Sequence, residues 1–283
     1  MSYTGGQNSQ GADTMLTLTY HGVTQVPVEV EGVTPDRVSG LTREEVERLP
    51  IYHGNRPATL GDFFQVAGDP SDEQIEWLGD LQGVHWIGAK MRTGRMFLRG
   101  SAGRHVGSEM AGGEIHVEGN VSDWAGGEMR GGLLQIRGNA GHLVGAAYRG
   151  SPRGMNRGVI LVHGNAGNEI GHTMRRGLIV IGGAAGDLIG FNMRAGTVLL
   201  AGDSGIRHGA GMRRGTLVFL GSRPPLLPSF RRACRYRPEF LALLLRQLRE
   251  SRFPVPDEWL SAAFELYSGD LIEGGRGEVL VRV

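Results

Sequence analysis

The middle of the chain repeats a short pattern of apolar and polar residues at a fixed interval. Each repeat opens with a glycine and continues with about five residues, of which the second and fourth are apolar. The strand-opening glycines are Gly94, Gly113, Gly132, Gly158, Gly177, Gly196 and Gly215. They lie 19 residues apart, except for one step of 26. Because successive side chains of a β-strand point to opposite faces, the apolar positions of all seven repeats are expected to line one interior.

A repeat of this length is typical of a solenoid, in which no unit can bury its apolar face without its neighbours. Helical repeats are disfavoured, because a glycine every five to seven residues would cost about 1 kcal/mol each inside helices. A propeller would need longer units of antiparallel strands. The sequence therefore predicts a mainly β protein built on a right-handed parallel β-helix of 19-residue coils. A methionine recurs in every coil, at Met91, Met110, Met129, Met155, Met174, Met193 and Met212. We expect these methionines to form a stacked interior ladder rather than a cofactor site.

The third residue of each strand, which should point outward, changes character along the chain. It is Phe97, His116 and Gln135 in early coils, whereas it is aliphatic in the later ones, as in Leu161 and Val180. An exposed apolar patch of that size would be a liability. We therefore expect the later coils to be covered, either by the C-terminal segment or by a partner subunit.

The segments outside the repeats predict four parts. Residues 1–14 form a flexible tail, 15–70 a small N-terminal α/β cap, 71–222 the parallel β-helix, and 223–283 a C-terminal helical segment with a final strand. In the cap, "LTREEVERL" offers Thr42 and Glu45 as a capping box. The stretch from "LGDFFQV" to "VHWIGAKMRTG" is interpreted as degenerate first coils. Pro238 is placed at the start of the C-terminal helix.

Composition narrows the classes of protein. Among 283 residues the formal net charge is only +1, which gives no global attraction to nucleic acid or to an anionic membrane. The lone Cys234 excludes an internal disulfide and cannot by itself hold an iron–sulfur cluster or a structural zinc. The N-terminal residues lack the features of a signal peptide, and the longest aliphatic run is far short of the ~20 residues that cross a bilayer. We expect a cytoplasmic protein.

No catalytic constellation emerges. The sequence has no Walker motif, no G-x-G-x-x-G between a strand and a helix and no G-x-S-x-G elbow. His142, His172 and His208 adjoin corner glycines without metal-ligand spacing, and we interpret them as solvated turn residues rather than ligands. We therefore assign no catalytic and no metal-binding residues and expect no cofactor bound by this chain alone.

Arginines recur just after the methionines and predict a basic column on the coils. Its members are Arg92, Arg130, Arg157, Arg175, Arg194 and Arg213, with Arg176 and Arg214 beside them. Like charges about 5 Å apart repel, so an extended anion or an acidic partner surface would be stabilised there. The alternative is solvated turn arginines paired with local acids, such as Glu109, Glu128 and Glu169.

One repeat carries seven extra residues, Tyr148 to Gly154, within "GAAYRGSPRGM". This insertion, the "G-x-x-x-G-x-x-M-x-x-G" coils, "LTREEVERLPIYHGN" and the closing "GDLIEGGRGEVLV" together resemble the C subunit of formylmethanofuran dehydrogenase. The chain is similar over roughly residues 30 to 283, and more closely to the bacterial counterpart in the formyltransferase/hydrolase complex of methylotrophs. A bare glycine–methionine coil is less specific, because the C-terminal domain of the glutamate synthase large subunit looks similar.

The resemblance implies a non-catalytic β-helix subunit. It implies a complex that moves a formyl group from formyl-tetrahydromethanopterin to a methanofuran-type carrier and hydrolyses it to formate. The implied partners are a formyltransferase, a zinc-bearing amidohydrolase-like hydrolase and a further subunit; the related archaeal enzyme adds molybdenum or tungsten and iron–sulfur subunits. On that basis Tyr148, Arg149 and Arg153 are expected to contact a partner subunit or the polyglutamate tail of the carrier. A tolerated surface loop is the alternative.

Two other functions compete with this one. A glutamate-synthase-type β-helix would be a spacer domain inside one long catalytic chain. We expect 283 residues to leave no room for the glutaminase or flavin domain of such a chain. An autonomous anion-binding solenoid would be a stable monomer without partners.

Overall fold

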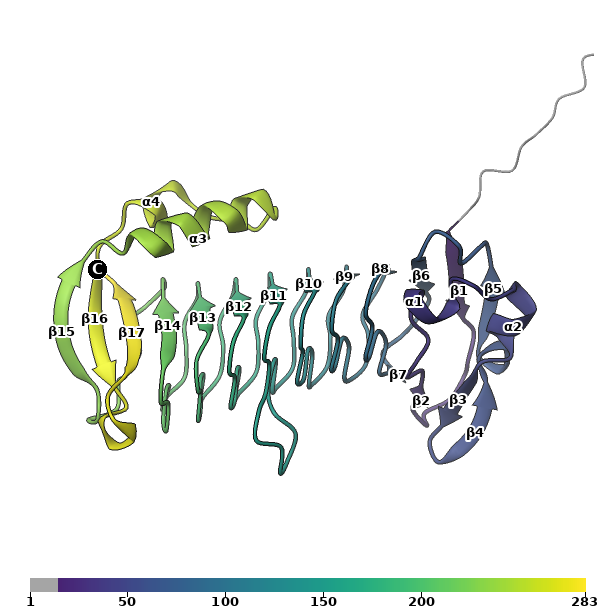
Figure 1. Ribbon diagram of the computed structural model, residues 1–283, viewed down its shortest axis with the longest axis horizontal. Helices are drawn as coiled ribbons and strands as arrows, with labels where there is room; N and C mark the ends of the chain where they lie inside the picture. Colours follow the sequence, from purple (N-terminus) through teal and green to yellow (C-terminus); the bar gives the residue numbers. More distant parts are fainter. Residues whose placement is uncertain (1–14) are drawn as a thin grey trace, which may run out of the picture.

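Short strands one repeat apart stack side by side in the computed structural model, which describes residues 15–283 (Figure 1). The predicted tail, residues 1–14, lies outside the described residues. The stacked strands are β8 (Arg95–Leu98), β9 (Glu114–Val117), β10 (Leu133–Ile136), β11 (Val159–Val162), β12 (Leu178–Ile181), β13 (Thr197–Leu200) and β14 (Gly215–Phe219). Each pairs in parallel with the next, so that Ile115 lies beside Leu134 and Ile160 beside Ile179. We call residues 94–219 the coil stack.

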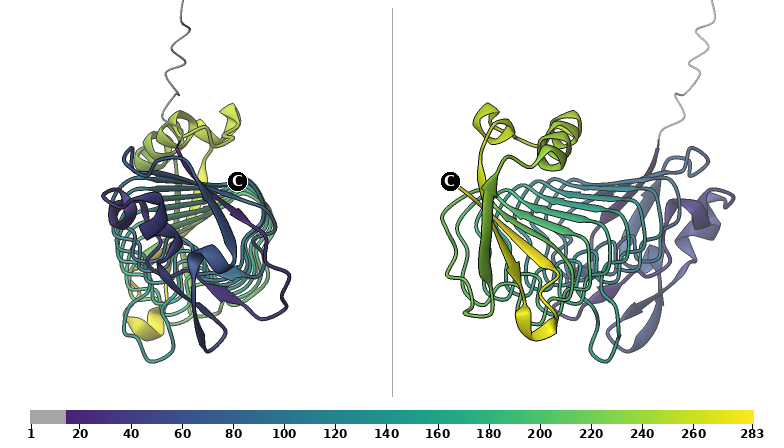
Figure 2. Two further views of the ribbon diagram at one scale, coloured as in Figure 1. Left: turned by 90° about the vertical axis from the view of Figure 1, so that its right-hand side faces the viewer. Right: turned by 60° about the vertical axis from the view of Figure 1, so that its left-hand side comes forward.

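The interior of the coil stack is lined as the repeat predicts. The apolar second and fourth positions of all seven strands are at most 2% exposed, and the seven repeat methionines are fully buried. The strands β8 to β13 have four residues, one fewer than expected, because the chain already bends into the next corner at the fifth position. Seen along the stack in Figure 2, successive coils superimpose around this apolar interior.

The pairing of glycine with methionine in the repeat has a steric cause. The methyl group of each methionine occupies the space beside the opening glycine of the next coil. A Cβ at Gly113 would lie 2.6 Å from the Cε of Met91, and one at Gly132 would lie 2.6 Å from the Cε of Met110. Both glycines also have positive φ, of 80° and 84°. Only glycine combines that backbone conformation with the missing side chain, so the two residue types recur together.

One large mixed sheet runs through the whole molecule, which is mainly β with few helices. Its strand order is β15-β16-β17-β14-β13-β12-β11-β10-β9-β8-β6-β1-β5. The N-terminal part comprises β1 (Leu16–Tyr20), β5 (Phe64–Ala67) and β6 (Gln74–Leu78). The interpretation of "LGDFFQV" as a first coil is wrong, because β5 runs antiparallel to β1 at the edge of the sheet. The strand β6, by contrast, pairs in parallel with β8.

A small second sheet closes the N-terminal end. Its order is β4-β3-β2-β7, formed by β4 (Arg56–Thr59), β3 (Pro50–His53), β2 (Val28–Glu29) and β7 (Val84–His85). Beside it lie α1 (Pro35–Val38), α2 (Arg43–Glu47) and η1 (Leu60–Asp62). The predicted capping box is confirmed, because the Glu45 N–H donates to the Thr42 hydroxyl and the Thr42 N–H donates to the Glu45 carboxylate.

The C-terminal segment ends the sheet and folds back over it. Its elements are β15 (Arg231–Tyr236), α3 (Glu239–Glu250), α4 (Asp257–Leu260), β16 (Phe264–Gly269), η2 (Leu271–Glu273) and β17 (Gly277–Arg282). The predicted helix after Pro238 and the predicted final strand are both present, and β17 continues the parallel ladder beside β14. The sequence pattern missed the antiparallel pair β15–β16.

The helix α3 supplies the cover that the aliphatic outer positions require (Figure 1). Leu161 and Val180 of the later coils are fully buried in a cluster with Leu245, which is also fully buried. Of the two covers that the sequence left open, the C-terminal segment of the same chain is the one observed.

Within residues 15–283 we find no helix that combines the length and apolarity needed to cross a membrane.

Candidate functional site

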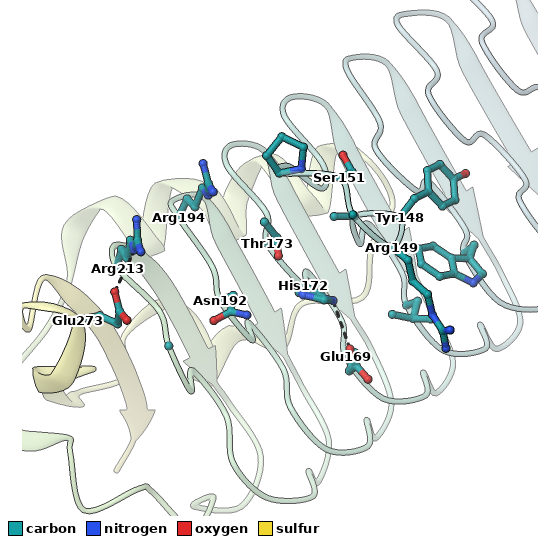
Figure 3. A pocket seen from close by; sticks show the side chains of 16 residues that line it. Tyr148, Arg149, Ser151, Glu169, His172, Thr173, Asn192, Arg194, Arg213 and Glu273 are labelled. Atoms are coloured by element: carbon teal, nitrogen blue, oxygen red, sulfur yellow. Dashed lines mark hydrogen bonds and ion pairs between the residues drawn. The ribbon is translucent and has the colours of Figure 1, made fainter.

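The inserted residues form one wall of an open groove on the side of the coil stack (Figure 3). The groove has a volume of about 750 Å³. Tyr148 to Pro152 line one side, and the corners of the following coils form the floor. The floor and far side include Glu169, His172, Thr173, Asn192, Arg194, Gly211, Arg213 and Glu273. Because the insertion projects from one coil only, it creates a hollow beside a surface that is otherwise regular.

Tyr148 anchors the insertion at its first residue. Its backbone N–H donates to the Glu128 carboxylate at 3.1 Å. Its ring stacks on Trp124 with centroids 4.9 Å apart, and its hydroxyl lies 3.2 Å from His105 Nδ1. Nothing lies within 4 Å of the position that a Cβ would take at Gly150, near the exposed tip of the loop. The groove wall is therefore held at its base and open to solvent at its tip.

The anchor belongs to a column of aromatic rings that sequence reasoning missed. Trp86 and His105 stack with centroids 3.9 Å apart and an interplanar angle of 6°, and His105 lies 6.0 Å from Trp124. The three residues are spaced by 19, the coil period, and this spacing is the signal that could have revealed the column.

Burial perturbs two titratable groups at this anchor. It lowers the pKa of His105 to about 4, and the neighbouring His85 and Arg104 act in the same direction. It raises the pKa of Tyr148 to about 12. At neutral pH both side chains are therefore uncharged, and their contact is an ordinary hydrogen bond between neutral groups. The side chains of His105 and Tyr148 therefore add no charge to the groove.

The groove lining contains more arginines than acidic residues. Arg213 pairs with Glu273 at 3.0 Å, and His172 Nδ1 lies 3.3 Å from the Glu169 carboxylate. Arg149 and Arg194 also line the groove, are exposed and make no ion pair within residues 15–283. A smaller hollow of about 290 Å³ adjoins the groove and is lined by Arg194, Arg213, Arg214, Glu273 and Arg276. This side of the coil stack can therefore bind carboxylates or phosphates through guanidinium groups.

The remaining predicted site residues divide between a second hollow and the open surface. Arg130 and Arg153 line a hollow of about 300 Å³ on the other side of the inserted loop, together with Glu128. Arg130 also pairs with Glu109 at 2.9 Å, as the alternative of local ion pairs predicts. Arg157 and Arg175 are exposed and line neither hollow. The structure thus gathers Tyr148, Arg149, Arg194 and Arg213 in one groove and leaves the other four outside it.

One prediction about a single residue is wrong. His208 is not a solvated turn residue: it is 1% exposed, its Nδ1 accepts the Ile189 N–H, and its Nε2 donates to the Gly205 carbonyl. It is buried because its ring packs 5.3 Å from the ring of Phe219 in the interior. Glu273 was not foreseen as a groove residue, because it pairs with Arg213 from 60 residues further along the chain. No local pattern could have placed it there.

Comparisons with known proteins identify relatives of one segment of the chain and a solved structure similar to almost all of it. No protein-family model matches the chain. A segment is 42% identical over 80 residues to the C subunit of the molybdenum-containing formylmethanofuran dehydrogenase 1 of Methanothermobacter thermautotrophicus, covering 28% of this chain and 20% of that protein. Another comparison gives 40% identity over 86 residues to the C subunit of the tungsten-containing formylmethanofuran dehydrogenase 2 of Methanothermobacter wolfeii, covering 29% of this chain and 32% of that protein. The matched segment therefore spans a third or less of these curated relatives.

The similarity to a solved structure extends over almost the whole chain. A chain of the crystal structure of the formyltransferase/hydrolase complex from Methylorubrum extorquens, solved in complex with methylofuran, superimposes with a TM-score of 0.87. The two chains are 32% identical, and the match covers 94% of this chain and 99% of the other.

Proposed function

This chain belongs to the family of formylmethanofuran dehydrogenase C subunits, and on that basis we propose that it is a non-catalytic structural subunit of a formyltransferase/hydrolase complex. The observation that carries the proposal is the end-to-end match, at 32% identity, to a chain of such a complex. The complex would transfer a formyl group from formyl-tetrahydromethanopterin to a methanofuran-type carrier and hydrolyse it to formate in the cytoplasm. A zinc-bearing hydrolase, a formyltransferase and a further subunit would be the partners.

The proposed scaffold role also rests on the architecture of the chain. We propose that residues 71–222 form a right-handed parallel β-helix between an N-terminal cap of residues 15–70 and a C-terminal segment of residues 223–283. The parallel ladder of coils one repeat apart supports this division. A stack of this kind is stiff because every coil is held by both neighbours, which suits a subunit that positions others.

Within that complex, the groove beside residues 148–154 would contact a partner subunit or the polyglutamate tail of the carrier. Arg149 and Arg194 support this, because they are exposed in the groove and have no ion pair in the described part of the chain. Arginine favours carboxylates, which it can bind through two parallel hydrogen bonds.

Co-expression of the tagged chain with its candidate partners tests the scaffold role. We expect recovery of a stable complex that contains all four subunits and forms formate from formyl-tetrahydromethanopterin. Omission of this chain should reduce assembly, while the isolated chain should show no formyl transfer or hydrolysis. Recovery of the chain only as a well-behaved monomer would instead favour an autonomous anion-binding solenoid.

Alanine substitution of Arg149 and Arg153 tests the role of the inserted loop. We expect weaker assembly or weaker retention of the carrier, measured by size-exclusion chromatography and by mass spectrometry of bound carrier. The matched control is Arg157→Ala/Arg175→Ala, which also removes two positive charges, from exposed residues outside both hollows. Unchanged assembly and carrier content in the double variant would identify the insertion as a tolerated surface loop.

A second candidate function is that of the C subunit in a molybdenum or tungsten formylmethanofuran dehydrogenase. The segment identities of 42% and 40% to such subunits favour it. Metal analysis of the purified complex separates the two functions. Zinc without molybdenum or tungsten supports the formyltransferase/hydrolase complex, and stoichiometric molybdenum or tungsten supports the dehydrogenase.

A further inference from the structure

The large sheet ends differently at its two edges (Figure 1). At the N-terminal edge, β5 contacts α2, and its residues alternate between buried and exposed. At the C-terminal edge, the first five residues of β15 are exposed and the last, Tyr236, is half-buried. Figure 1 shows no element beyond β15. At the N-terminal edge a helix of the chain packs against the outermost strand, whereas at the C-terminal edge the outermost strand is exposed along almost its whole length; we call the latter the open edge.

The open edge leaves backbone groups without a partner in this chain. The strand β15 pairs only with β16, and residues 231–236 make no backbone hydrogen bond to any other segment within residues 15–283. The strand has six residues, with a register shift between Arg232 and Cys234, and is longer than the very short strands that often protect an edge. Such an edge can accept one more strand through main-chain hydrogen bonds.

The side chains of β15 determine which charge is favoured on an added strand. Arg231, Arg232 and Arg235 lie in the strand, and Arg237 follows it. Glu265 on the neighbouring strand β16 is the only acid that these arginines pair with in the described residues, through Arg232 at 2.9 Å. Arg223 binds the same carboxylate, which further neutralises it. The edge therefore presents guanidinium groups that lack counter-charges.

This charge pattern disfavours pairing of two copies through β15. Arginines of one copy would lie beside arginines of the other, and like charges opposite each other destabilise a strand pair. An acidic strand would instead form cross-strand ion pairs, and the forked guanidinium matches a carboxylate in geometry. The same arginines thus discourage self-association and favour one class of partner.

We propose that β15 is a docking edge for an extended acidic segment of a partner protein, which adds to the large sheet as one more strand. The main-chain hydrogen bonds of the edge would supply affinity. The register with β16 shifts between Arg232 and Cys234, so Arg231 and Arg235 lie on opposite faces of β15, and each face would favour glutamate or aspartate on the added strand. This interaction is separate from the groove beside residues 148–154 and does not depend on the chemistry of the proposed complex.

Peptide binding to the full-length chain tests the proposal. The probe is a fluorescent peptide of about nine residues with alternating glutamate and valine, a length that spans the strand. The control peptide has the same charge but carries proline at two of the valine positions, which prevents strand pairing. We expect the first peptide to bind at least tenfold more tightly than the second by fluorescence anisotropy. We also expect it to slow amide hydrogen exchange in residues 231–236.

Variants of the chain sharpen the test. The double variant Arg231→Glu/Arg235→Glu should weaken binding at least tenfold without lowering Tm, because both side chains are exposed. The charge-matched control is Arg246→Glu/Arg252→Glu, two exposed arginines outside the strand, which should leave binding unchanged. Equal binding of the proline peptide, equal binding of a single-stranded oligonucleotide of the same charge, or no binding at millimolar peptide would each overturn the proposal.

Discussion

The outward face of the large sheet has two halves with the same backbone and opposite chemistry. Over β8 and β9 it carries the half-buried Phe97 and His116 together with charged residues. Arg99 joins Glu76 at 2.7 Å and Glu118 at 2.6 Å across three strands. Over β11 to β13 the equivalent positions are aliphatic and fully buried beneath α3, as with Leu161 and Val180.

The comparison shows that the repeat determines the residues at inward strand positions, whereas the neighbouring elements determine those at outward positions. The inward positions are alike in both halves because each coil must fill the same interior, whereas the outward position follows the cover above it. Gln135 lies at the boundary and is 6% exposed. Its side chain hydrogen-bonds to His116 at 3.2 Å and to His163 at 2.9 Å, so the polar groups buried at the margin of the cover have partners.

The largest expected effect comes from placing a charge under the cover. Val180→Asp buries an unpaired carboxylate between the sheet and α3, and we expect a loss of about 3 to 5 kcal/mol of unfolding free energy. Phe97→Asp, at the equivalent position of the open half, should cost only about 1 kcal/mol, because the new carboxylate stays hydrated. Chemical denaturation followed by circular dichroism measures both. Equal losses would show that the cover does not distinguish the two halves.

A smaller effect tests the cover from its own side. Leu245→Ala removes a fully buried side chain from the inner face of α3, and we expect a loss of about 2 to 4 kcal/mol. Leu243→Ala makes the same substitution on the same helix at a residue that is 60% exposed, and should change stability by less than about 0.5 kcal/mol. If both variants unfold at the same denaturant concentration, α3 does not pack as described.

A pH effect is expected from His105 at the anchor of the inserted loop. The folded protein holds the pKa of His105 at about 4, below the ~6.5 of an unfolded chain, so the unfolded state binds more protons between these values. Stability should therefore fall as the pH decreases from about 6.5 to about 4. His105→Gln should reduce this loss by about 1 kcal/mol, a value discounted for the partial exposure of the ring. Thermal unfolding at several pH values measures the difference. Parallel profiles for the variant and the wild type would contradict the role assigned to His105.

The smallest effect concerns the ion pairs that occupy the open half in place of a cover. Arg99→Ala should cost no more than about 1 kcal/mol, because the arginine and Glu118 are well exposed. The cost should shrink further in about 1 M salt, which screens exposed charges. Unfolding at low and high salt measures it. A large, salt-independent loss would mean that packing of the arginine stem, and not its charge, stabilises this face.

Much of the fold could be predicted because the repeat places equivalent residues at fixed intervals. The burial of Ile115, Ile179 and Val198 follows from strand alternation alone, and the buried methionines follow from their recurrence. The helix after Pro238 follows from its apolar stripe. The direction of β5 could not be predicted, because its sequence alternates like a coil strand, while its antiparallel direction depends on its pairing with β1, far earlier in the chain.

The candidate site was only partly predictable. The insertion and its arginines were visible as a break in the period, and Tyr148, Arg149, Arg194 and Arg213 do line one groove. The contact of Glu273 with Arg213 and the burial of His208 were not visible, because both depend on segments that the chain brings back from its C-terminal end or packs in the interior.

The inward half of this protein follows from the amino-acid sequence, since a 19-residue period of glycines, aliphatic residues and methionines stacks these residues in one interior. The outward half does not: the coils that α3 covers, the arginines that meet a counter-charge and the exposed strand at the edge of the sheet are visible only once the chain has folded. The difference lies in the range of the interactions. Alternation within a strand and stacking between adjacent coils are local and repeat along the chain, whereas a cover or an ion pair depends on where a distant, non-repeating segment comes to rest.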